Sequence, residues 1–274
     1  MKPRGILFLA ILLAALEVPA PSDASVWVPA KKKGQAAFTF TYYETKELFD
    51  SRGTTYKMAS NGVFVKHEVN AYLEYGLGSN FSVCLNLFAV TQQFKSDTVA
   101  QTYSGAGDQE MCLKYLILAS PVNFGVQAGV KVPAYDLAFA DPAPGNGQFD
   151  YELRLMLGNP ILSSGFWDLE AAYRYRDGYP ADEVRIDATV GAGFFARFKV
   201  LLQFNGISGM RNGQVYSRGN NPTIDPEYDL YKGGVSFVYD VSQKSSLQIG
   251  GIRHFSGTNT GARGSFFLSL WRRF

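Results

Sequence analysis

The chain has 274 residues, of which 46% are hydrophobic, 15% aromatic and 18% charged, and its formal net charge is +2. A charge this close to zero gives no electrostatic basis for binding nucleic acid. The 28 glycines and the many aromatic residues favour a β-rich chain with much of its surface out of water. The two cysteines are too few for a disulfide framework.

The beginning of the chain is arranged like a secretory signal peptide. A basic start precedes a short apolar run at 5–16, and small residues at 22–24 stand where signal peptidase cuts. The apolar run is too short to span a bilayer as a helix. We therefore expect residues 1–24 to direct secretion across the inner membrane and to be removed. The mature chain would begin near Ser25 and form one domain, 25–274.

The rest of the chain alternates between apolar and polar residues with a period of two, which predicts β-strands. No apolar run in it reaches the ~20 residues that a membrane helix needs. Turn-forming stretches divide it into twelve candidate strands, at 34–44, 63–75, 81–94, 107–118, 124–134, 149–158, 165–176, 183–194, 199–211, 228–240, 246–256 and 264–274. By these boundaries every second connection is long, about twelve residues against about five, which is typical of outer-membrane barrels.

Most candidate strands have one apolar face and one polar face. On strand 149–158 the two faces are Tyr151, Leu153, Leu155 and Leu157, and Asp150, Glu152, Arg154 and Met156. Twelve such strands in one sheet cannot all cover their apolar faces with protein. Lipid can cover them, and a closed barrel satisfies every backbone hydrogen-bonding group. The sequence therefore predicts an all-β fold, a single closed antiparallel transmembrane β-barrel of about twelve strands with a polar interior.

Three consecutive strands, 149–158, 165–176 and 183–194, carry charges of both signs on their polar faces. The expected lumen residues are Asp150, Glu152, Arg154, Asp168, Glu170, Arg174, Arg176, Glu183, Arg185 and Asp187. Opposite charges on adjacent strands can form a cross-strand ladder. Such a ladder either forms a constriction that sorts small solutes by charge and hydrogen bonding, or it is an ion-pair network that fills the bore. The sequence leaves both interpretations open.

Two cysteines lie on the inward faces of adjacent candidate strands. Cys84 and Cys112 face each other directly only if the hairpin between them is centred on Thr98. The strand boundaries centre it nearer Ala100 or Gln101, and a slip of one pair would prevent a disulfide. The sequence therefore leaves the disulfide open.

The stretch RHFSGTNTG (253–261) contains a histidine and a serine two residues apart. Side chains at His254 and Ser256 share one face of a regular strand, where an imidazole can activate a hydroxyl. The pattern resembles the His-x-Ser-Asn motif of the outer-membrane phospholipase A and lipid A deacylase families. Gly257 stands where that motif has Asn, and no acidic or amide side chain follows Thr260 to orient the imidazole. A polar pair at the barrel rim is the alternative interpretation.

The chain ends in an aromatic residue on an alternating strand. Phe274 is in phase with Phe266, Leu268 and Leu270. A closing strand that ends in Phe resembles the signal read by the outer-membrane assembly machinery. That signal has an aromatic residue two places before the final Phe, where this chain has Arg272.

Four stretches in the middle of the chain together form a further pattern. They are GAGDQEMCLKYLI (105–117), FGVQAGVKVP (124–133), GQFDYELRLMLG (147–158) and AAYRYRDGYPADEVRIDATVG (171–191). A Gly-Asp opens a strand, a Lys-Val-Pro ends the next, and an acidic hairpin follows. This pattern resembles the outer-membrane transporter family labelled "MetA-pathway of phenol degradation". The resemblance implies a transporter-type β-barrel, and it suggests small organic compounds, including aromatic ones, as the cargo.

We therefore expect a channel in the outer membrane of a Gram-negative envelope, which passes small organic solutes through a lumen of mixed charge. Its expected partners are membrane lipid, the solute and the outer-membrane assembly machinery, and no nucleic acid. No cofactor, metal site or enzymatic activity is expected. Two alternatives remain: a lipid-modifying enzyme that uses His254 and Ser256, and a structural barrel that does not conduct.

Overall fold

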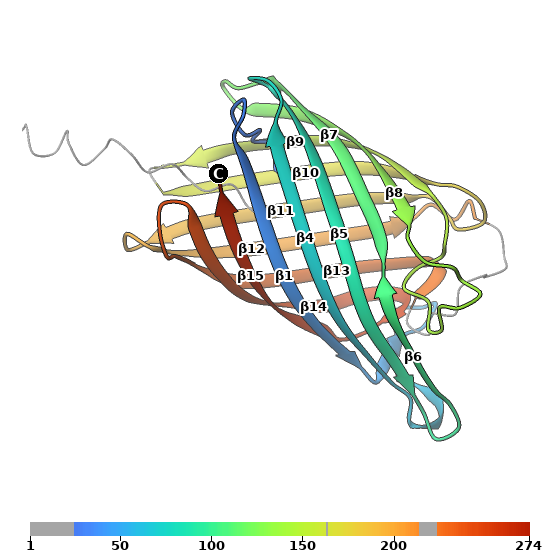
Figure 1. Ribbon diagram of the computed structural model, residues 1–274. Coiled ribbons are helices and arrows are strands. Elements are labelled where there is room, and N and C mark those ends of the chain that lie inside the picture. The colour runs from blue at the N-terminus through green and yellow to red at the C-terminus, as the bar shows by residue number, and fades with distance from the viewer. Residues whose placement is uncertain (1–24, 163, 214–223) are drawn as a thin grey trace, which may run out of the picture.

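Long antiparallel strands follow one another around a closed barrel (Figure 1). The structure is a computed structural model, which describes residues 25–162, 164–213 and 224–274. The twelve wall strands are β1 (Gly34–Thr45), β4 (Val63–Gly76), β5 (Phe81–Lys95), β7 (Asp108–Leu118), β8 (Asn123–Pro133), β9 (Asp150–Ile161), β10 (Gly165–Arg176), β11 (Glu183–Phe194), β12 (Phe198–Gly209), β13 (Ile224–Asp240), β14 (Ser245–Gly261) and β15 (Gly264–Arg273). Strand β1 pairs with β15, from Gln35 opposite Arg273 to Tyr43 opposite Ser265, and this pairing closes the sheet. The predicted fold class is confirmed.

Short connections gather at one end of the barrel, together with Gly34 and Phe274 (Figure 1). They are 77–80, 119–122, 195–197, 241–244 and the step from Ile161 to Gly165. We call this the short-turn end and the opposite one the long-loop end. No helix in the described part of the chain is long and apolar enough to cross a bilayer. The predicted signal peptide, 1–24, lies outside the described residues.

Extra strands extend the wall at the long-loop end. The hairpin of β2 (Glu47–Phe49) and β3 (Thr55–Lys57), followed by a 3-10 turn at Ala59–Asn61, pairs with the end of β14. β14 itself continues to Gly261, so the predicted loop 257–263 is mostly strand. The backbone groups of this extension of β14 pair with β2 and β13. The strand therefore continues here, because ending it earlier would leave an unpaired strand edge.

The two cysteine-bearing strands, β5 and β7, pair in a different register from the one that the predicted strand boundaries give, and a bulge contributes to the difference. The predicted loop 95–106 is instead a turn at 96–99 followed by β6 (Ala100–Ala106), which pairs with β5. One extra residue at the junction of β6 and β7 shifts the register by one place. The side-chain amide of Gln109 occupies this break, accepting from the backbone N–H of Phe88 and donating to its carbonyl. Cys84 thereby comes opposite Cys112 at a Cα–Cα distance of 4.9 Å, and the two form a disulfide.

The apolar faces of the strands point outward. On β9, Leu153 is 59% exposed, whereas its polar neighbours Glu152 and Arg154 are buried. On β15, Phe266 is 73% exposed and Leu268 is also exposed, whereas Ser269 is buried. Other exposed members of this belt include Met111, Leu113, Tyr115, Leu155, Leu169, Tyr173, Ile186, Leu202, Phe237, Ile249, Leu268 and Leu270. Such a belt around a closed barrel is stable only if hydrocarbon covers it. The structure therefore has the inverted arrangement that the alternation predicts.

Candidate functional site

A cavity of about 610 Å³ lies inside the barrel. All twelve wall strands contribute side chains to its lining, and Pro144 from the loop between β8 and β9 adds to them. The lining holds five Lys or Arg side chains and six Asp or Glu side chains, beside aromatic and aliphatic groups such as Tyr43, Phe64 and Leu230. The interior therefore offers a small molecule both charged and apolar surfaces without a dominant sign of charge.

The predicted charge ladder is present on β9, β10 and β11. Arg154 donates to Glu152 at 2.9 Å, to Glu170 at 2.5 Å and to Asp187 at 2.6 Å. Glu170 and Asp187 are direct cross-strand partners, and two like charges so placed repel each other. The guanidinium of Arg154 bonds to both and removes this repulsion. A buried charge is tolerable when it is paired in this way.

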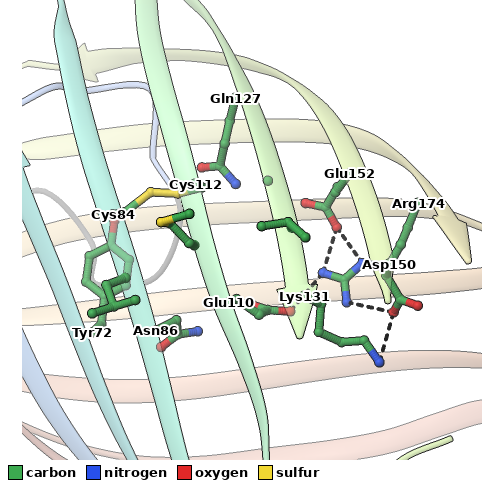
Figure 2. A pocket seen from close by; sticks show the side chains of 14 residues that line it. Tyr72, Cys84, Asn86, Glu110, Cys112, Gln127, Lys131, Asp150, Glu152 and Arg174 are labelled. Atoms are coloured by element: carbon green, nitrogen blue, oxygen red, sulfur yellow. Dashed lines mark hydrogen bonds and ion pairs between the residues drawn. A yellow bond between two sulfur atoms is a disulfide. The ribbon is translucent and has the colours of Figure 1, made fainter. Parts of the chain in front are cut away.

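A second arginine extends the ladder toward β7. Arg174 lies opposite Glu152 in the β9–β10 register and donates to it at 2.8 Å, and it reaches Glu110 on β7 at 3.0 Å. Figure 2 shows Arg174 and its carboxylate partners on one side of this part of the interior, with the disulfide on the other. Lys131 joins the network through Asp150 at 3.2 Å. The ladder therefore spans at least four consecutive strands of the wall.

Nine of the ten predicted lumen residues take part in ion pairs. Those nine are Asp150, Glu152, Arg154, Glu170, Arg174, Arg176, Glu183, Arg185 and Asp187. Asp168 is the exception among the described residues, since none of their basic groups lies within 4.0 Å of its carboxylate. Asp168 instead accepts a hydrogen bond from a backbone N–H of the N-terminal segment.

That N-terminal segment, residues 25–33, enters the barrel at the short-turn end. Ser25 and Val26 are fully buried, and the Val26 N–H donates to Asp168 at 3.1 Å. The Lys114 ammonium donates to the carbonyl of Ser25 at 3.2 Å. Trp27 packs edge-on against Phe166, with ring centroids 5.7 Å apart. This placement could not be predicted from the sequence, because the short apolar run Val26-Trp27 has no pattern that distinguishes a lumen segment.

A compact polar network supports the N-terminal segment from β4 and β7. Lys114, only 1% exposed, pairs with Glu74 at 3.3 Å. Glu74 also accepts from Tyr72 at 2.9 Å and from Ser82 at 2.6 Å. Next to it, Tyr72 belongs to an apolar cluster with Ala37, Cys84, Phe166, Leu201, Val238 and Trp271. These groups fill the lumen at the short-turn end.

The loop between β8 and β9, residues 134–149, folds into the barrel at the long-loop end. Ala143 is fully buried, and the side chain of Gln92 donates to the Pro142 carbonyl at 2.7 Å. Tyr135 donates to Asp108 at 3.0 Å. Burial and the adjacent carboxylate of Asp108 raise the pKa of Tyr135, so its hydroxyl stays a donor. The loop therefore narrows this end of the lumen.

The structure does not bring His254 and Ser256 together. A bulge leaves Phe255 unpaired, so His254 is opposite Lys232 while Ser256 is opposite Tyr231. Neighbouring residues of a strand point to opposite faces, and His254 lines the cavity while Ser256 is exposed. The imidazole bonds through Nδ1 to the Gly261 carbonyl at 2.8 Å and stacks on Tyr43. This arrangement does not favour activation of the Ser256 hydroxyl by His254.

Phe274 completes the seam between the first and last strands. Its N–H donates to the Gly34 carbonyl at 3.0 Å, and its carbonyl accepts from the Gly34 N–H at 2.9 Å. Its ring is half exposed at the barrel surface. No group of three or more His, Cys, Asp or Glu side chains in the described ranges is arranged to hold a metal ion.

The backbone is similar to solved outer-membrane barrels. The COG4313 outer membrane channel from Pseudomonas putida F1 aligns with a TM-score of 0.71 at 12% identity, over 93% of this chain and 100% of that chain. The NanC porin aligns at 0.55 with 10% identity, over 85% and 98% of the two chains. The KdgM porin aligns at 0.52 with 7% identity, over 87% and 99%. No family model and no curated protein matches the chain. The similarity establishes the barrel fold.

Proposed function

We propose that the protein is a passive outer-membrane channel for small organic solutes. The observation that carries this proposal is the cavity inside the barrel, which every wall strand lines. A barrel whose interior merely packed side chains against one another would leave no such space. The structurally similar proteins include an outer membrane channel and two porins, which supports the same role.

The ladder around Arg154 and Arg174 is the proposed constriction. It places Glu110, Glu152, Glu170, Arg185 and Asp187 on one wall of the cavity, with hydrogen-bonding groups of both kinds. Opposite charges in similar number predict weak selectivity for the sign of the solute. The aromatic and aliphatic side chains elsewhere in the lining suit solutes with an apolar body, including the aromatic compounds suggested by the sequence resemblance.

The same proposal includes the route to the membrane. Residues 1–24 would act as a cleaved signal peptide, and the C-terminal Phe274 would be read by the outer-membrane assembly machinery. The exposed apolar belt then meets lipid. Short connections at one end and longer ones at the other place the short-turn end toward the periplasm.

Solute efflux from liposomes that contain the refolded barrel tests the channel. We expect efflux of small organic solutes above that of empty liposomes, and a changed rate and single-channel conductance in Arg174→Ala and Glu152→Ala, because each change removes a charge from the cavity wall. Arg52→Ala, at an exposed position of the β2–β3 hairpin, is the matched control. A folded barrel that releases no solute would overturn the proposal.

A barrel that does not conduct is the second candidate, because the chain's own segments enter both ends of the lumen. Residues 25–33 occupy the short-turn end and 134–149 the long-loop end. For a barrel that does not conduct, we expect a blocked pore and a specific protein that binds the exposed loops. Solute efflux that responds to Arg174→Ala would exclude it.

A further inference from the structure

We propose that removal of the signal peptide creates the missing cation of the lumen: the new α-ammonium group of Ser25, which docks on the carboxylates of Asp168 and Glu170. Signal peptidase hydrolyses the Ala24–Ser25 peptide bond with one water molecule, leaving a carboxylate on Ala24 and an amine on Ser25 that takes up a proton. The proposal rests on the predicted cleavage before Ser25 and does not depend on whether the barrel passes solutes.

The first observation is that Asp168 is buried without an ion pair, although the charge of Lys114 acts on it from a distance. Its side chain is only 4% exposed, and it is the lumen carboxylate without an ion pair among the ten predicted positions of the described chain. Glu170, two places along β10 and 1% exposed, uses Oε2 to bind Arg154. Its Oε1 is buried without a donor, and its carboxylate lies close enough to that of Asp168 for the two to repel each other when both are charged. Burying carboxylate oxygens in this way is costly unless a charged donor reaches them.

The second observation is the position of Ser25. The peptide group that joins Ser25 to Val26 is held at both of its polar atoms: the Val26 N–H donates to Asp168 at 3.1 Å, and the Ser25 carbonyl accepts from the Lys114 ammonium at 3.2 Å. Standard bond lengths place the nitrogens of neighbouring residues within about 4 Å of each other. Together with the 3.1 Å hydrogen bond of Val26, this places the Ser25 nitrogen within about 7 Å of the Asp168 carboxylate. The Ser25 hydroxyl is also buried without a partner, so this pocket contains further unsatisfied hydrogen-bonding capacity.

Lys114 acts on Asp168 only from a distance, because its ammonium is bound to other groups. Its ammonium is within 3.3 Å of Glu74 and of the Tyr72 hydroxyl, and within 3.2 Å of the Ser25 carbonyl. An ammonium on Ser25 has three donors, which suits one carboxylate oxygen on each of Asp168 and Glu170. The processed terminus then anchors the segment in the lumen, whereas an unprocessed chain has an uncharged amide at the same place.

Reactivity of the α-amino group tests the proposal on the mature protein. An amine-reactive ester at about pH 7 prefers an α-amino group, whose ordinary pKa is about 7.7–8.0, to lysine at about 10.4. We compare wild type with Asp168→Asn, whose amide oxygen can still accept the Val26 hydrogen bond but which has no charge. Asp177→Asn, an identical change at an exposed position of the long-loop end, is the matched control.

We expect mass spectrometry to find Ser25 as the first residue. We also expect the Ser25 amine to be labelled about tenfold more slowly in wild type and Asp177→Asn than in Asp168→Asn. A tenfold difference in rate corresponds to a pKa of the amine that is about one unit higher when Asp168 is charged. A second variant keeps Asp168 and places Gly-Ser before Ser25, so that the amine moves away from the carboxylates. It should label as fast as Asp168→Asn. A different first residue, equal labelling of wild type and Asp168→Asn, or a protected amine in the extended chain would each overturn the proposal. If Asp168→Asn does not fold, the extended chain decides.

Discussion

Arg154 shows how one side chain can make a like-charged strand pairing stable. Glu170 and Asp187 face each other across β10 and β11, and the guanidinium binds both, with Glu152 as a third partner. All three carboxylates lie on the polar inner face, where lower dielectric strengthens repulsion as well as attraction. Arg154 therefore helps to hold three neighbouring strands of the wall together.

Replacing Arg154 by Met should destabilise the barrel. The change leaves carboxylates of Glu152, Glu170 and Asp187 without their common cation, and breaking a buried pair in this way costs about 3–5 kcal/mol. We expect the urea midpoint of unfolding in lipid vesicles to fall accordingly. Arg52→Met, at an exposed position, should change the free energy of unfolding by less than about 0.5 kcal/mol. Equal midpoints for the two variants would show that the ladder does not hold the wall together.

At the scale of elements, the strands could be predicted because lipid imposes a simple rule on them. Each strand must show apolar groups to hydrocarbon and hide its charges, so alternation on β9 or β10 is visible in the sequence alone. The charge ladder followed from the same rule, since Glu152, Arg174 and Glu183 occupy the inner faces of adjacent strands.

Bulges and inserted segments could not be predicted in this way. The extra residue near Gln109 shifts a register without altering the local pattern, and it decides that Cys84 meets Cys112. The unpaired Phe255 separates His254 from Ser256, which regular alternation would place on one face. The segment at 25–33 owes its position to contacts with distant strands, and such contacts leave no local periodicity.

The N-terminal segment should limit passage through the barrel, since it fills the lumen beside Phe166 and Asp168. Deleting residues 25–30 removes Val26 and Trp27 from the short-turn end while leaving β1 intact. We expect the folded variant to release solutes from liposomes severalfold faster than wild type. Lys31→Ala, at an exposed residue beyond the deleted stretch, should leave the rate unchanged. Unchanged efflux in the deletion variant would mean that the segment does not obstruct the path.

At the scale of the whole molecule, the barrel is arranged as an inverted globular protein. The largest exposed apolar side chains form the outer belt, and ion pairs fill much of the interior. A closed sheet leaves no unpaired edge in hydrocarbon. The cavity remains because the charged wall on β9 to β11 and the opposite wall do not meet across the bore.

The most direct test of this inversion is the accessibility of spin labels on β9 in lipid bilayers. Single cysteines are introduced at successive positions from Tyr151 to Leu157 in the oxidised protein, whose native cysteines are engaged with each other. We expect labels at 151, 153, 155 and 157 to collide readily with lipid-dissolved oxygen, and those at 152, 154 and 156 not to do so. Oxygen accessibility that is highest at the even positions, or that does not alternate, would contradict this expectation.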